Sequence, residues 1–175
     1  QLSDEWYWAA AELYITTGHA AFGDHVRKSK WSLEVPTAAD GDGGGTMSAM
    51  TWQLMAAPGT ISLAVVPNKL GADAMNMARN KVIEVADEFL KATSVQGYRI
   101  PFRAPAEGGY PWGSNSFIIN NAVIMGLAYD FTRKKIYVDG VLDATNYLLG
   151  VNPIGQSYVS WYGSKPLENP HHRWF

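Results

Sequence analysis

The stretch GADAMNMARNKVIEVADEFLKAT, residues 71–93, decides the fold class, because its apolar residues recur with the period of an α-helix. One side of this helix would carry Ala74, Met75, Ala78, Val82, Val85, Phe89 and Leu90. The opposite side would carry most of the charges, at Lys81, Glu84, Asp87, Glu88 and Lys91. Such a division predicts a long surface helix with one face in a core.

Segments on both sides of this helix carry helical patterns as well. WYWAAAELYITTG follows Ser3, a favourable N-cap, and ends at Gly18, a favourable C-cap. Further helices are predicted over residues 20–29, 46–57, 60–66, 114–131 and 137–149. The helix over 114–131 is almost wholly apolar, which predicts burial on every side. Strand patterns are scarce, so the sequence predicts an all-α fold.

Long loops are predicted between these helices. Residues 38–45 are rich in glycine, residues 95–113 in glycine, proline and aromatic side chains, and a third long loop runs from Gly150 to Phe175. Loops of this length in a compact domain usually carry function.

Composition narrows the class of protein. A chain of 175 residues with 47% hydrophobic and 17% charged residues is typical of one globular domain with a core. The net charge of −2 gives no electrostatic case for nucleic acid, and no apolar run is long enough to span a membrane. Aromatic residues make up 13% of the chain. Most are expected in the core, but exposed rings also stack on sugars, and both roles stay open.

Three motifs then point to one family. NYLLGVNPIGQSYVSWYGSKPLENPHHR, residues 146–173, resembles a signature of glycoside hydrolase family 9, the inverting cellulases. DEWYWAAAELYITTG, residues 4–18, resembles a helix of that family. GGYPWGSNS, residues 108–116, is similar to a stretch in the branch that includes cellobiohydrolase-like enzymes. The motifs occur in the family's order and together extend over most of the chain.

The resemblance implies a fold and an activity. The fold would be part, roughly half, of an (α/α)₆ barrel with long active-site loops, so that residues 1–175 form a catalytic domain incomplete at both termini. The activity would be hydrolysis of β-1,4-glucosidic bonds in cellulose or related β-glucans with inversion. Inversion requires a general acid and a general base about 6.5–9.5 Å apart, and by the resemblance both lie outside these residues. The partners implied are a β-1,4-glucan and the remainder of the catalytic domain.

The resemblance also leaves an alternative and implies a location. The alternative is an inactive half-barrel that only binds carbohydrate or a partner fragment. The location would be extracellular, because cellulose cannot enter a cell. Neither endo nor exo action follows from the sequence.

The proline–histidine–histidine–arginine motif supplies the first candidate site residues. The resemblance assigns His171 and Arg173 to the catalytic site, where they would orient the sugar at the cleaved bond, and groups His172 with the substrate-binding residues. An arginine offers rigid, always-charged donors, and a neutral histidine can bond a sugar hydroxyl. Without the resemblance, a surface salt-bridge cluster would be the simpler interpretation.

The second motif supplies the aromatic candidates. The resemblance implies that Trp112 stacks a glucose unit beside the cleaved bond, with Tyr110 and Asn115 as weaker partners. The alternative for Trp112 is anchoring of its own loop. Trp52 is interpreted as a core residue, because it falls in a predicted apolar helix.

Two acidic sites complete the set of candidates. Asp4 and Glu5 match positions at which some family members bind a structural calcium, although simple helix-start acids explain them too. The chemistry itself requires no cofactor. Asp24, in AFGDHV at 21–26, resembles the end of the family's catalytic aspartate motif. In the family that motif lies before the helix of residues 4–18, whereas Asp24 lies after it. We therefore interpret Asp24 as a solvated or capping acid.

Overall fold

The computed structural model describes residues 2–38, 48–104 and 109–171, and the regular structure in these ranges is helical, as predicted. The elements are α1 (Ser3–Thr17), α2 (Ala20–Lys28), α3 (Ala56–Val65), α4 (Ala72–Val95), the short 3₁₀ helix η1 (Gly97–Arg99), α5 (Ser114–Thr132) and α6 (Lys135–Leu148). Two isolated bridges are the only β pairing in the described ranges.

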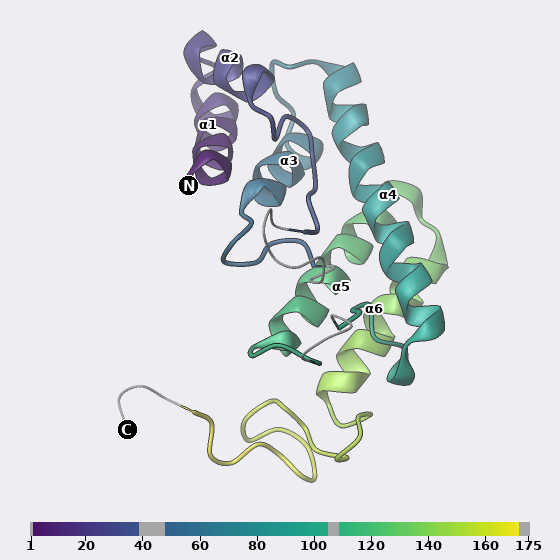
Figure 1. Cartoon of the computed structure of the whole chain (residues 1–175). Helices are drawn as coiled ribbons and strands as arrows, with labels where there is room; N and C mark the ends of the chain where they lie inside the picture. The colour runs from purple at the N-terminus through teal and green to yellow at the C-terminus, as the bar shows by residue number, and fades with distance from the viewer. Residues whose placement is uncertain (1, 39–47, 105–108, 172–175) are drawn as a thin grey trace.

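The helices form a row in which α1, α3, α4, α5 and α6 pack one against the next, with α2 packed on α1. Contacts join α1 to α2 and α3, α3 to α4, α4 to α5, and α5 to α6. The connections at the two ends of this row differ in length (Figure 1). Residues 48–55, 96–104, 109–113 and 149–171 lie beyond the N-terminal ends of α3 and α5 and the C-terminal ends of α4 and α6, which we call the loop end. The opposite end, the turn end, has the short connections at residues 18–19, 66–71 and 133–134.

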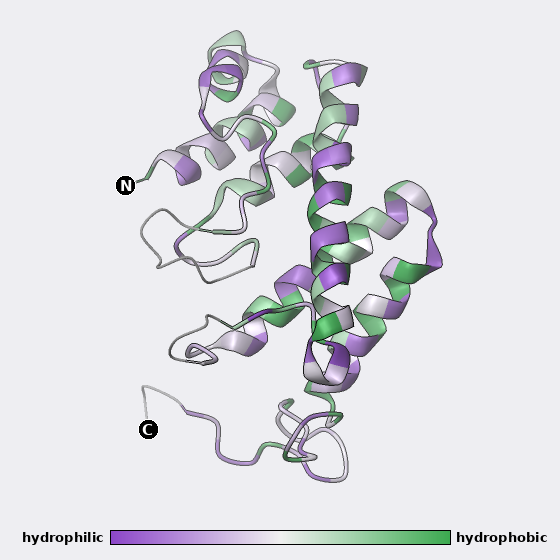
Figure 2. Ribbon diagram, turned by 45° about the vertical axis from the view of Figure 1, so that its right-hand side comes forward, coloured by the Kyte–Doolittle hydropathy of each residue, from purple (hydrophilic) through white to green (hydrophobic). Residues whose placement is uncertain are grey.

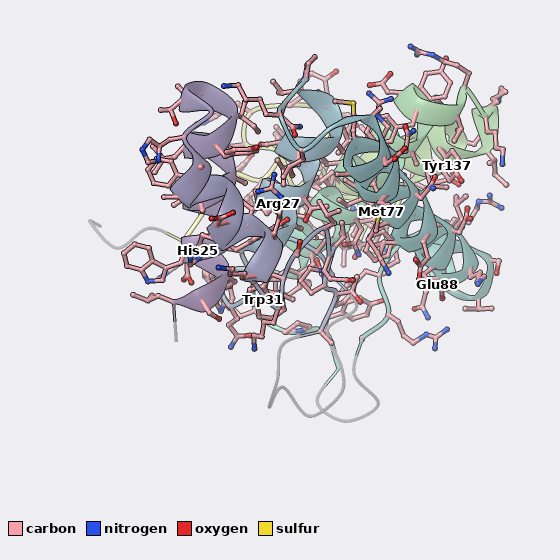
Figure 3. All side chains as sticks on the ribbon, turned by 90° about the horizontal axis from the view of Figure 1, so that it is seen from above. His25, Arg27, Trp31, Met77, Glu88 and Tyr137 are labelled. Atoms are coloured by element: carbon pink, nitrogen blue, oxygen red, sulfur yellow. The ribbon has the colours of Figure 1, made fainter. Side chains whose placement is uncertain are left out.

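The larger core lies between α4, α5 and α6. Its fully buried side chains include Val82, Phe89, Ile118, Met125 and Tyr137. The charged side of α4 faces outward, so the helix divides into an apolar and a polar side as its periodicity predicts (Figure 2). Met77 and Glu88 project from its exposed surface (Figure 3).

The smaller core joins α1 to α3. The Tyr7 hydroxyl lies 2.9 Å from Thr60 Oγ1 and accepts the backbone N–H of Leu33 at 3.0 Å. Burial raises the pKa of the Tyr7 hydroxyl. A Cβ at Gly59 would lie only 3.0 Å from the Trp8 Cα, so glycine permits the close approach of the two helices.

Asn121, fully buried on α5, connects that helix to two of the loops. Its Oδ1 accepts the backbone N–H of Ala49 at 3.2 Å, and its Nδ2 donates to the Pro101 carbonyl at 2.7 Å. The neighbouring Asn120 donates to the Met50 carbonyl at 2.7 Å. These two side chains therefore fix the segments before α3 and after η1 against one helix.

These contacts explain why the predicted helix over residues 46–57 is wrong. Of the described residues 48–57, only Ala56 and Ala57 are helical, and residues 48–55 form turns with Met50 at φ +59°. The backbone groups of Ala49 and Met50 bond to the α5 asparagines instead of to a helical ladder.

Two smaller predictions are also wrong. Ser3 is the first residue of α1 and not its N-cap, because its Oγ accepts the Trp31 Nε1–H at 3.1 Å. Helix α5 is not buried all round, since Val123 is 47% exposed. Its contacts with helices are to α4 and α6, which leave another side uncovered.

We predict that Asn121→Ala lowers the free energy of unfolding by about 3 kcal/mol, because it leaves a buried N–H and a buried carbonyl without their partners. Urea unfolding of the protein measures this change. Asn80→Ala removes an exposed asparagine from α4 and should change stability by less than about 0.5 kcal/mol. Equal effects of the two substitutions would contradict the role given to Asn121.

Candidate functional site

The loop end carries a concentration of exposed aromatic side chains. They are Trp52, Tyr98, Tyr110, Trp112, Trp161 and Tyr162, each about half exposed or more. All six lie on the connections before α3, between α4 and α5, and after α6. The aromatic excess in the composition thus serves both the core and one exposed end of the molecule.

A chain of ring contacts ties part of this surface to the core. The Trp112 and Trp52 centroids lie 6.0 Å apart with 44° between the planes, and Trp52 lies 5.8 Å from Phe117. Phe117 then contacts Phe102 at 5.7 Å, and Phe102 contacts Tyr110 at 5.8 Å. Because Phe102 and Phe117 are buried, they hold the exposed rings of Trp52, Trp112 and Tyr110 in fixed positions.

Trp52 is a functional candidate that sequence reasoning placed wrongly. It is 60% exposed in a turn, and not buried in a helix. The polar neighbours Thr51 and Gln53 could have signalled an exposed position. Together with Trp112, which is 77% exposed, Trp52 presents a tilted pair of indoles to solvent.

The other candidates of the second motif lie beside this pair. Gly113 has φ +76°, a left-handed conformation that turns the chain from Trp112 into α5. Asn115 follows in the first turn of α5, where it is half-buried. Tyr110 is 51% exposed and rests against Phe102.

Tyr147, near the end of α6, joins two of the loops. Its ring contacts Tyr98 at 6.3 Å and Tyr158 at 5.9 Å. Burial, first of all, and the neighbouring hydroxyls of Tyr158, Tyr110 and Tyr98 together raise the pKa of the Tyr147 hydroxyl to about 12. Tyr98 and Tyr158, from the connections before α5 and after α6, therefore meet over one half-buried phenol.

Hydrogen bonds from the side chains of Asn152 and Gln156 to backbone carbonyls hold the 149–171 connection in place. Asn152 is buried, and its Nδ2 donates to the carbonyls of Tyr147 and Gln156, each at 2.8 Å. Gln156 Nε2 donates to the Pro166 carbonyl at 3.1 Å, and Ser157 N–H donates to the Lys165 carbonyl at 2.9 Å. A long segment without helix or strand thus has a defined path.

This connection leads to the third motif. His171, its last described residue, is exposed at the loop end. His172 and Arg173 lie outside the described residues. The sugar-orienting roles that the sequence assigns to these three residues therefore stay predictions.

Asp4 and Glu5 lie in the first turn of α1. Asp4 is buried and its Oδ2 accepts the Met55 N–H at 2.8 Å. Burial alone would raise the pKa of Asp4, but hydrogen bonds from the Glu5 side chain and the Met55 amide lower it overall. The shared hydrogen bond raises the pKa of Glu5. Glu5 Oε2 is buried and has no hydrogen-bond partner among the described residues.

This pair supplies part of a cation site. Two adjacent carboxylates with one unbonded, buried oxygen suit a hard cation such as calcium. Within residues 2–38, 48–104 and 109–171, no third acidic, histidine or cysteine side chain joins them in a group. Carbonyl oxygens or water would have to supply the remaining ligands.

Asp24 lies apart from the loop end. It is on α2, exposed, and pairs with Arg27 at 3.4 Å. Its neighbours His25 and Arg27 lie on the outer pair of N-terminal helices, away from α4 and α6 (Figure 3). This placement is that of a solvated helix acid.

Comparison with known proteins agrees with the motifs. The sequence profile of Glycosyl hydrolase family 9 matches residues 1–175. The chain is 44% identical to Cellulose 1,4-beta-cellobiosidase of Acetivibrio thermocellus over 99% of its own length and 20% of that protein. It is 40% identical to Endoglucanase C of Cellulomonas fimi over its whole length and 15% of that protein. The chain therefore spans a fifth or less of these relatives.

Solved structures show the same fold. A metagenome-derived glycoside hydrolase family 9 endoglucanase superposes with a TM-score of 0.82 at 28% identity, over 99% of this chain and 29% of that one. Endoglucanase J30, also of family 9, gives a TM-score of 0.79 at 28% identity over 98% of this chain and 29% of its own. The row of helices corresponds to a portion of each of these larger catalytic chains.

We predict that Tyr147→Phe makes the protein less sensitive to alkali. A phenol whose pKa is raised in the folded state stabilises the protein below its unfolded pKa of about 10 and loses that contribution as the pH rises to about 12. The melting temperature of the wild type should therefore fall relative to Tyr147→Phe between these pH values. If the melting temperatures of the two proteins changed in parallel with pH, the pKa of Tyr147 would not be raised in the folded state.

Proposed function

The chain belongs to glycosyl hydrolase family 9, and from that membership we propose that the protein containing it is a cellulase. It would hydrolyse β-1,4-glucosidic bonds in cellulose or a related β-glucan with inversion. The observation that carries the proposal is the match of the whole chain to the family, together with exposed indoles at the loop end of the helices. The helical row would form part of an (α/α)₆ barrel.

In this proposal the residues of the chain bind and orient the glucan. Trp112 and Trp52 would stack glucosyl rings, because the flat apolar face of an indole matches the apolar face of a β-glucose ring. Trp52 contacts the buried Phe117, and Trp112 contacts Trp52, so that both rings are held in place before substrate arrives. Such preorganisation lowers the entropy that binding must overcome.

The third motif would act closest to the cleaved bond. His171 and Arg173 would bond the hydroxyls of the sugar at that point and hold its ring in the reactive orientation. The general acid and general base would come from parts of the protein beyond these 175 residues. Inverting hydrolysis places them on opposite sides of the scissile bond, with water beside the base.

We also propose an extracellular location, since the substrate is an insoluble polymer. Among the described residues, no helix has the length and apolarity needed to cross a membrane.

Hydrolysis of cellopentaose and swollen cellulose by the full-length protein tests the proposed function. The expected result is new reducing ends, with the α-anomer appearing first in the NMR spectrum because of inversion. Early β-anomer would contradict the inverting mechanism. Absence of any hydrolysis would favour the alternative, a segment that binds carbohydrate or a partner without catalysis.

Trp112→Ala should lower kcat/KM on cellopentaose about tenfold, which corresponds to about 1.4 kcal/mol of transition-state binding. Glu88→Gln, on the exposed outer side of α4, should leave kcat/KM unchanged (Figure 3). An unchanged value for Trp112→Ala would assign this tryptophan to loop anchoring.

A structural calcium at Asp4 and Glu5 is part of the proposal. The buried, unbonded Glu5 Oε2 supports it. Calcium at 100 times its dissociation constant should stabilise the wild type by about 2.7 kcal/mol relative to chelator. Glu5→Gln should abolish this gain, and Glu88→Gln should retain it; calorimetry with and without calcium measures both. A calcium response that survives Glu5→Gln would place the ion elsewhere.

A further inference from the structure

We propose that Trp161 is an additional contact for the glucan chain, outside the Trp52–Trp112 pair and the histidine–arginine motif. This inference rests on the proposed glucan-cleaving function and adds a residue that extends the bound length of substrate. Trp161 is 85% exposed, the most exposed of the large hydrophobic side chains in the described ranges. It makes no ring contact with another described aromatic residue.

The backbone at Trp161 is unfavourable for a tryptophan. The Tyr162 N–H donates to the Val159 carbonyl at 3.3 Å, so residues 159–162 form a four-residue turn. Trp161 is the third residue of this turn and has φ +64°. A positive φ at this position is the feature of a type II turn, in which glycine is the usual residue because a Cβ is strained there. Stability alone would therefore favour glycine at this position.

The surrounding loop holds the turn in this conformation. Ser160, directly before Trp161, pairs with Leu167 in an isolated bridge. Ser157, just before the turn, bonds to Lys165 through its N–H and to the Val159 N–H through its Oγ. The backbone at Trp161 is therefore held in place, although the indole ring itself is exposed to solvent. Strain that is maintained by neighbouring bonds is typical of functional positions.

The position of Trp161 suits a carbohydrate polymer. Ser160 pairs with Leu167, four residues before His171, so the turn lies on the same loop as the predicted sugar-orienting motif. That loop also encloses a hollow lined by polar side chains, among them Gln156, Lys165, Glu168 and Asn169. One loop thus carries an exposed flat ring and a set of hydrogen-bonding groups, the two kinds of contact that bind a chain of glucosyl units.

The test compares Trp161→Gly, Trp161→Phe and the wild type in the full-length protein, on cellohexaose and on the shortest oligosaccharide that the wild type cleaves. Trp161→Gly should lower kcat/KM on cellohexaose about tenfold (about 1.4 kcal/mol) and change it less than about twofold on the short substrate. Trp161→Phe keeps a ring and should retain most of the activity on cellohexaose.

Stability provides the second measurement. Because Trp161→Gly removes the positive-φ strain, its melting temperature should equal or exceed that of the wild type. Arg133→Gly is the matched control, since Arg133 is also exposed at positive φ, 60°, but caps α5 at the turn end. It should leave hydrolysis of both substrates unchanged.

Three results would overturn the inference. One is equal activity of Trp161→Gly and the wild type on cellohexaose. Another is an equal loss on the long and the short substrate. The third is a lower melting temperature of Trp161→Gly, which would show that the ring is packed inside the whole protein. If the wild type cleaved no β-1,4-glucan at all, the proposed function itself would fail, which is a distinct outcome.

Discussion

The arrangement of the loop end depends on one buried carboxamide. Asn121 on α5 bonds Ala49 on one side and Pro101 on the other, although these residues lie 72 and 20 positions away in the chain. Both loops carry aromatic side chains of the candidate site: Trp52 follows the first bond, and Tyr110 and Trp112 follow the second. The carboxamide thus helps to determine which rings meet, because residues 48–55 and 100–104 have no helical or strand bonds of their own to define their path. Its burial makes the bonds hard to replace by water.

The sequence predicted the regular part of this fold well. Helices α1, α4, α5 and α6 were expected within a few residues of their ends, because each carries a long periodic apolar pattern. Residues 48–55 were wrongly predicted as helix, since their conformation depends on side chains of α5 that are distant in sequence. Trp52 was misplaced for the same reason. Local periodicity cannot contain that information.

The candidate site was predictable only in part. The motifs pointed to Trp112, Tyr110 and the end of the 149–171 connection, and the connections that carry these residues lie at one end of the helices. The motifs did not contain Asn121 and gave no role to Asn152, since the sequence does not show which backbone groups a buried asparagine will meet. Nor did they indicate that Trp161 would have a positive φ, which depends on the turn closed by Val159 and Tyr162.

The unequal ends of the helical row have a consequence for how such a protein can change over evolutionary time. The short connections at the turn end leave little freedom to insert or delete residues without shifting one helix against the next. Segments at the loop end can vary in length and composition as long as a few anchoring bonds persist. New substrate preferences could therefore arise by remodelling one rim of the molecule, while the helices beneath it retain their packing.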